Sequence, residues 1–134
     1  EKALRPEAPE ESEIGFRAKD DLIDGISIES FSRDQKEHAQ KVLRSLLEPY
    51  RLKDREEALT ALQKQGGLDA CNLTFYKKDD LGNDAIWDNW RLEGPSFVWH
   101  YRGAPHVHVW LNVADTAKVD LNSQNRSGPL RQKS

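Results

Sequence analysis

Two histidines, His106 and His108, are the residues of this sequence whose types and spacing point most directly to chemistry. On an extended backbone, residues two apart leave the same face of a strand with their Cα atoms about 7 Å apart. Imidazole is a ligand common to zinc, copper, nickel and iron sites, so one strand can supply two ligands to one ion. The spacing therefore predicts a site on this strand, with a divalent transition metal, zinc or copper, as the candidate cofactor.

A third histidine, His100, joins the pair in only one of two registers of the hairpin that connects them. If residues 103–104 form a two-residue turn, Arg102 pairs with Pro105 and His100 points to the opposite face. If the loop is three residues long, His100 faces His108 and all three histidines share one face. Pro105 has no N–H to give to a strand ladder, which favours the second register.

The candidate metal ligands are therefore His100, His106 and His108, and Glu93 and Asp115 are the acids best placed to complete the site. The same histidines also fit a purely structural role, in which half-buried imidazoles bond to backbone or tryptophan N–H groups, because the chain offers no obvious fourth ligand. A third alternative is a hydrolase-like enzyme with His106 or His108 as general base. The sequence identifies no other catalytic residue.

All four tryptophans lie between Trp87 and Trp110, in the most aromatic stretch of a polar chain. Tryptophan offers a broad apolar face and one N–H donor, which suits stacking on a flat ligand. In a small domain without methionine, the same side chains also supply buried area to the core. The candidate ligand-binding residues beside the histidines are Arg91, Glu93, Trp99 and Trp110.

Two helices are expected in the first half of the chain. Ser32 and Gln35 form a capping box ahead of apolar residues at helical spacing, and the helix is expected to end before Pro49. A second capping signal at Asp54 begins another helix, which Gly66-Gly67 ends. The two helices are expected to pair as an N-terminal helical hairpin.

After these glycines the apolar period changes from 3.6 to about 2, which is typical of strands. Strands are expected over residues 71–76, 86–92, 96–102 and 106–113, while residues 25–31 are expected to form an extended lead-in. The predicted fold class is α+β, with the N-terminal helical hairpin packed on a three- to four-stranded antiparallel β-meander.

The length of 134 residues fits one domain, which we place at residues 14–115. Residues 1–13 are predicted to be a flexible acidic arm and residues 116–134 a polar, basic C-terminal tail, because neither stretch has enough apolar side chains to offset the entropy of ordering.

The net charge of −3 argues against nucleic acid as a partner. No apolar run is long enough for a membrane span. The single cysteine, Cys71, is expected to be a small packed residue.

Three motifs in order carry a resemblance to a known family. They are Leu46-Leu47-Glu48-Pro49-Tyr50, Trp90-Arg91-Leu92-Glu93-Gly94-Pro95 and His106-Val107-His108. Over residues 22–115 the chain resembles the C-terminal half of domain-of-unknown-function family 3500, which is found mostly in bacteria. The resemblance singles out Arg91, Gly94, Pro95, His106 and His108 as recurrent positions. It implies a fold and a site but no reaction, and it implies that this chain is the C-terminal part of a longer protein.

Together these features predict an uncharacterised bacterial domain that binds a metal or a small ligand through its His-x-His hairpin. The alternatives are a metal-dependent enzyme using the same cluster and a structural or interaction domain with packed histidines. The expected partner is a small molecule or the missing N-terminal part of its own longer chain. The localisation is unknown from the sequence; because the chain begins at Glu1 and has no methionine, a removed signal peptide would make it secreted or periplasmic.

Overall fold

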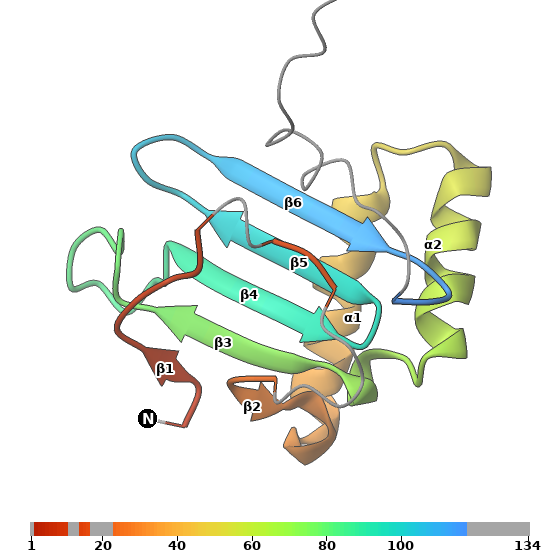
Figure 1. Ribbon diagram of the computed structural model, residues 1–134, viewed down its shortest axis with the longest axis horizontal. Helices are drawn as coiled ribbons and strands as arrows, with labels where there is room; N and C mark the ends of the chain where they lie inside the picture. The colour runs from red at the N-terminus through yellow and green to blue at the C-terminus, as the bar shows by residue number, and fades with distance from the viewer. Residues whose placement is uncertain (1, 11–13, 17–22, 118–134) are drawn as a thin grey trace, which may run out of the picture.

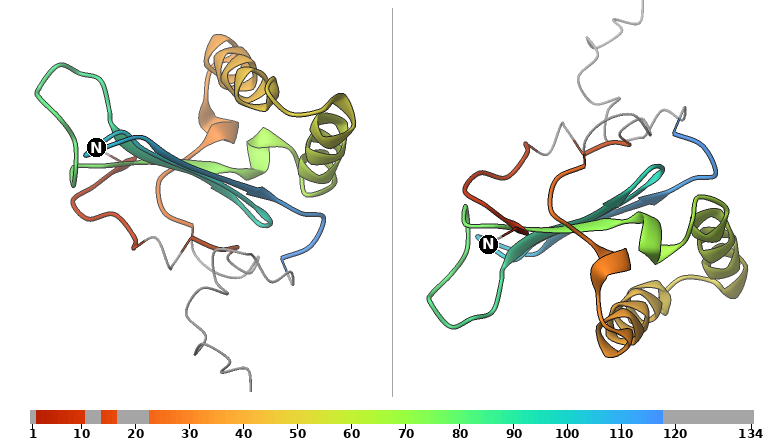
Figure 2. Two further views of the ribbon diagram at one scale, coloured as in Figure 1. Left: turned by 90° about the horizontal axis from the view of Figure 1, so that it is seen from above. Right: turned by 90° about the horizontal axis from the view of Figure 1, so that it is seen from below.

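The computed structural model describes residues 2–10, 14–16 and 23–117. Its strands are β1 (Leu4–Arg5), β2 (Ile26–Ser27), β3 (Asn72–Tyr76), β4 (Asn89–Gly94), β5 (Phe97–Arg102) and β6 (His108–Val113). Its helices are α1 (Arg33–Leu47) and α2 (Leu52–Lys64), with short 3-10 turns η2 (Ile28–Ser30) and η3 (Leu68–Ala70). The two helices cover one face of a single sheet (Figure 1, Figure 2), so the predicted α+β class is confirmed.

The sheet is mixed, and the expectation of a purely antiparallel sheet was wrong. Strands β3 to β6 do form a four-stranded antiparallel meander. At its edge, however, β1 pairs with β3 in parallel and β2 pairs with β3 antiparallel, which makes six strands in all. Strand β1 comes from the stretch predicted as an arm, and β2 comes from the predicted lead-in. Both are two residues long, too short for a period-2 pattern to reveal.

The prediction of an N-terminal helical hairpin is not confirmed either, because β1 and β2 precede α1. Helix α1 itself begins as expected. The Ser32 hydroxyl accepts from the Gln35 N–H at 3.3 Å, and the Gln35 side-chain oxygen accepts from the Ser32 N–H at 2.9 Å. Helix α2 begins at Leu52 rather than after Asp54, and the Asp54 carboxylate instead accepts from Arg51 Nε at 2.8 Å within the first turn.

The alternation of side chains along the meander gives the sheet two unlike faces. One row of paired residues runs across the sheet as Leu73, Leu92, Trp99 and Leu111 and packs against the helices. The next row runs as Thr74, Arg91, His100 and Trp110 and faces the other way. Leu43 and Leu47 of α1 and Leu62 of α2 complete the helix-side core. We call these the apolar face and the polar face of the sheet.

Both predicted registers of the last hairpin were wrong. Arg102 pairs with His108, so the loop spans residues 103–107, and His100 pairs with Trp110. The Gly103 N–H donates to the Asp88 carbonyl oxygen at 2.6 Å and is therefore not available to β6. Because Pro105 has no N–H, the ladder resumes only at His108, and His106 lies in the loop rather than on the strand.

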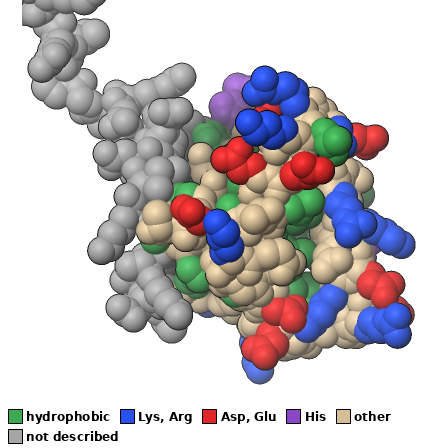
Figure 3. All heavy atoms as spheres, turned by 90° about the vertical axis from the view of Figure 1, so that its right-hand side faces the viewer, with side chains coloured by type: hydrophobic (Ala, Val, Ile, Leu, Met, Phe, Trp, Pro, Cys, Tyr) green, Lys and Arg blue, Asp and Glu red, His purple; other side chains and the backbone are tan. Residues whose placement is uncertain are grey.

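Basic and acidic side chains are interspersed on the side of the molecule that carries α2 (Figure 3). Three ion pairs connect neighbours on or beside the helices: Arg33 with Glu37, Lys36 with Asp69, and Arg51 with Asp54. Within residues 2–10, 14–16 and 23–117, neither helix is both long and apolar enough to cross a membrane.

Candidate functional site

The predicted histidine site forms a row of rings rather than a cluster. The ring centroids of His106 and His108 are 4.4 Å apart, and Trp110 follows at 5.2 Å from His108. His100 lies beyond Trp110, with 5.6 Å between those two ring centroids. In the observed register, β6 places Trp110 opposite His100, where the second predicted register placed His108.

His100 is buried on the polar face and has a fixed protonation state. Only 3% of its surface is exposed, and its Nδ1 accepts from Arg91 Nε at 3.2 Å. Tyr76 stacks on the ring at a centroid distance of 5.9 Å. Burial, together with the charges of Arg91 and Arg102, lowers the pKa of His100 to about 3. At neutral pH the ring is uncharged, and since Nδ1 accepts from a guanidinium, the ring proton is on Nε2.

The other predicted metal-site residues do not gather around His100. His106 is exposed and His108 is half-buried. Glu93 has its carboxylate 3.8 Å from Arg91 Nη1, and Asp115 lies 3.9 Å from Lys64 Nζ. Over the described ranges, the structure brings no three His, Cys, Asp or Glu side chains close enough to hold a metal ion together.

The four predicted ligand-binding residues are divided between the two faces. Arg91 and Glu93 are buried on the polar face, with exposed fractions of 1% and 4%. Trp110 is half-buried on that same face, and the guanidinium carbon of Arg102 lies 5.8 Å from the centroid of its ring. Trp99 lies on the apolar face, against the helices. The predicted set therefore does not form one binding site.

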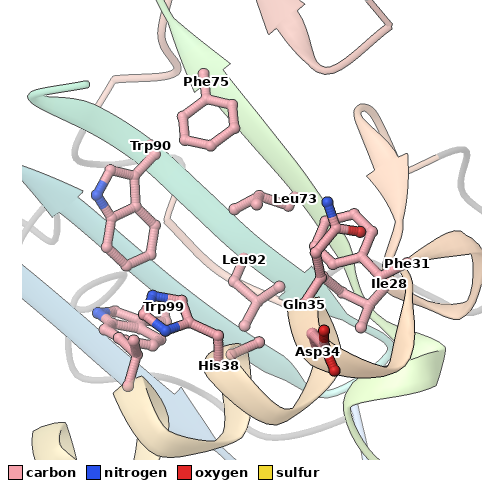
Figure 4. Close-up of a pocket in the computed structure, with 12 residues that line it drawn as sticks. Ile28, Phe31, Asp34, Gln35, His38, Leu73, Phe75, Trp90, Leu92 and Trp99 are labelled. Carbon is pink, nitrogen blue, oxygen red and sulfur yellow. The ribbon is translucent and has the colours of Figure 1, made fainter. Parts of the chain in front are cut away.

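A pocket of about 430 Å³ lies between α1 and the apolar face (Figure 4). Its lining side chains are Ile28, Phe31, Asp34, Gln35, His38, Ala39, Val42, Leu73, Phe75, Trp90, Leu92 and Trp99. The exposed surface inside it is almost entirely apolar. Its size falls in the range of about 300–1,000 Å³ that is typical of small-molecule sites.

The aromatic wall of this pocket is built by neighbouring strands. Trp90 of β4 meets Trp99 of β5 edge to face, with ring centroids 4.7 Å apart and an interplanar angle of 71°. Tyr101 stacks on Trp90 at 5.6 Å and 23°. Phe75 of β3, which lies opposite Trp90 across the ladder, extends the wall. Trp90 is held by two rings and is therefore positioned before any ligand arrives.

Three polar residues of the first turns of α1 border the pocket, although their polar atoms add almost nothing to its inner surface. They are Asp34, Gln35 and His38, and all three side chains are exposed. Asp34 and His38 are four residues apart and lie on the same side of the helix. His38 is thus an exposed helix residue that also borders the pocket.

Sequence reasoning missed this pocket, although part of the signal was present. Leu73, Phe75, Trp90 and Leu92 alternate with polar residues on two strands, and that pattern places them on one face. What the pattern does not reveal is the space between this face and α1, which depends on how far the helix stands from the sheet.

Comparisons with protein families, with curated proteins and with solved structures find no match for this chain.

Proposed function

We propose that this domain is a small-molecule-binding module whose ligand occupies the pocket between α1 and the apolar face. The observation that carries the proposal is the pocket itself, with an aromatic wall on the sheet and polar groups only along α1. Binding sites for small molecules combine mostly apolar walls with a few placed polar groups, and they are usually preformed. Trp99 is only 5% exposed yet lines the pocket, so the wall reaches the core of the domain.

The sequence-based prediction places the small-ligand site at the His-x-His hairpin. The present proposal places that site on the opposite face of the sheet. The cavity beside His100 measures about 40 Å³, room for one or two water molecules only. Metal binding at the hairpin, an enzymatic reaction there and the resemblance to family 3500 stay predictions.

Filling the pocket tests the proposal. Ala39 is the smallest side chain that lines it, and it is half-buried on α1. We expect Ala39→Leu to fold normally, because the added carbons enter existing space, and to lose ligand binding. The matched control is Lys41→Leu, which places the same side chain at an exposed α1 position that does not line the pocket.

Binding is followed in a library of small aromatic and aliphatic compounds through the indole N–H resonances of Trp90 and Trp99. The expected result is a set of compounds that shift both resonances in the native protein and in Lys41→Leu but not in Ala39→Leu. The proposal fails if no compound shifts these resonances at millimolar concentration. It also fails if the compounds bind the Ala39→Leu variant as tightly as they bind the native protein.

A further inference from the structure

We infer that the ligand of this pocket is an organic amine with an aromatic or similarly apolar body, whose ammonium group lies beside Asp34. The inference rests on the proposed function, because it names the class of ligand that the same pocket takes. It is carried by three features: the open carboxylate of Asp34, the lack of a cation among the described lining residues, and the arrangement of the aromatic rings.

Asp34 is a charge at the rim of the pocket that its neighbours do not neutralise. Arg33 is occupied by Glu37, with 3.0 Å between Arg33 Nε and the Glu37 carboxylate. Lys36 is occupied by Asp69, also at 3.0 Å. Asp34 itself makes no ion pair with any residue in the part of the chain that the structure describes. Asp34 lies in the first turn of α1, where the helix dipole stabilises a negative charge. Because it makes no ion pair with a described residue, its oxygens can accept a further partner.

Two ionisable side chains, Asp34 and His38, are among the described residues that line the pocket. Among the described residues that line it, none is lysine or arginine, and Asp34 is the one carboxylate. An anionic ligand would meet like charge at the rim and find no lining cation in compensation. A ligand that carries a positive charge is attracted there, and its apolar part can enter the pocket.

The rings are placed to receive such a ligand along its whole length. Trp90 and Trp99 lie at one end of the pocket, while Phe31 and Asp34 lie at the other (Figure 4). An apolar body that stacks on Trp90 therefore directs its far end toward Asp34. There the ammonium group meets the Asp34 carboxylate, and Phe31, which lines the same end of the pocket, adds an aromatic ring to which a cation is attracted.

Three compounds with one body and different head groups test this inference: 4-phenylbutylamine, 4-phenyl-1-butanol and 4-phenylbutyrate. Each is titrated against the native protein while the tryptophan fluorescence and the indole N–H resonances are recorded. We expect the amine to bind most tightly, by about fivefold over the alcohol, and the carboxylate least tightly. We also expect the affinity for the amine, but not for the alcohol, to fall as sodium chloride is raised.

The variant Asp34→Asn removes the charge with little change of shape. It should weaken binding of the amine about two- to fivefold and leave binding of the alcohol unchanged. The matched control is Glu48→Gln, which removes one negative charge at the exposed C-cap of the same helix, a position that does not line the pocket. The salt titration on the native protein gives the same discrimination if the Asp34 variant does not fold.

The outcomes separate this inference from the proposed function. If the alcohol or the carboxylate binds as tightly as the amine, or if Asp34→Asn is without effect on the amine, the amine inference is overturned while the pocket remains a ligand site. If none of the three binds and neutral library compounds do, the inference is again overturned. If no compound of any kind reaches the pocket, both proposals fall together.

Discussion

The two faces of the sheet differ in what they bury and in how much space they leave. The apolar face packs leucines and tryptophans against two helices and still encloses a pocket of about 430 Å³. The polar face buries an arginine, a glutamate and a histidine, and the cavity beside them measures about 40 Å³. After β1, residues 6–10 cross that second side of the sheet (Figure 2), and Ala8 and Pro9 help to enclose the small cavity.

This difference teaches that reactive residue types and binding space need not coincide. Two of the candidate site residues, Arg91 and His100, bond to each other in a filled layer. The space for a ligand lies across the sheet, beside residues whose types suggest only a core. The two faces therefore call for different tests: stability for the polar face and ligand binding for the apolar face.

The largest effect is expected at Arg91. Its Nε donates to His100 and its Nη1 lies 3.8 Å from the Glu93 carboxylate, with 1% of the residue exposed. Arg91→Met should lower the free energy of unfolding by about 3–5 kcal/mol, because it removes a buried charge that lies beside the Glu93 carboxylate and bonds to His100. Urea denaturation followed by tryptophan fluorescence measures the loss.

The control for this prediction is the double variant Arg91→Met with Glu93→Gln. It removes the charge that the single variant leaves behind, so we expect it to regain more than about 1 kcal/mol. A single variant that loses less than about 1 kcal/mol would show that the polar face does not depend on this pair.

The next largest effect is expected on the apolar face. Leu43 of α1 is 3% exposed and belongs to the core, while its neighbour Val42 is 37% exposed and lines the pocket. Leu43→Ala should lower the free energy of unfolding by about 2–5 kcal/mol, because it leaves a cavity in packed surroundings. Val42→Ala should lower it by less than about 1 kcal/mol, because the side chain already borders open space. Equal losses in the two variants would mean that the pocket is closed in solution.

An effect confined to acid, and absent at neutral pH, is expected from His100. Its pKa is about 3 in the folded protein against 6.5 for an ordinary histidine. Below pH 6.5 the unfolded state binds a proton at His100 that the folded state does not, so the free energy of unfolding falls as pH falls from 6.5 toward 3. The contribution approaches about 1.4 kcal/mol per pH unit. His100→Gln should flatten the profile of stability against pH in this window.

The matched control is His38→Gln, at an exposed position of α1. It should leave the slope of that profile unchanged, because it leaves the buried polar face and His100 intact. If both variants change the slope by the same amount, the low pKa of His100 is refuted.

These contrasts also mark what the sequence can predict. The beginning of α1 is predictable because Ser32 and Gln35 bond across three residues, and the alternation along β3 is predictable because Leu73 and Phe75 are neighbours on one strand. Cys71 was likewise expected to be packed; it is buried, and burial with the nearby Glu93 charge raises its pKa to about 12. All of these are local patterns.

The features that decide the candidate site are not local. The register of the last hairpin depends on the bond from the Gly103 N–H to Asp88, fifteen residues earlier. The pairing of β1 with β3 joins Leu4 to Phe75 across most of the chain. The pocket arises from the separation of α1 and the sheet, a distance that no spacing in the sequence encodes. Residue types therefore predict candidates, but long-range pairing determines which of them meet.

The smallest effect on stability is expected at the hairpin, where the metal prediction can still be tested. His106 is exposed and His108 half-buried, so we expect the double variant His106→Ala, His108→Ala to change the free energy of unfolding by less than about 1 kcal/mol. Zinc added to native protein without a histidine tag should shift the imidazole resonances of His106 and His108 first, because their ring centroids are 4.4 Å apart. His38, a histidine on the helix surface, is the internal control.

The resonances of His100 show whether the polar face stays closed during this titration. The Nδ1 atom of His100 accepts from Arg91 and only 3% of the residue is exposed, so its resonances should move least. Zinc that moves His100 together with the other two would mean that the polar face opens to admit an ion, and the contrast between a filled and an open face would be lost. Zinc that moves His38 as readily as His106 would show that the pair has no affinity beyond that of a lone imidazole.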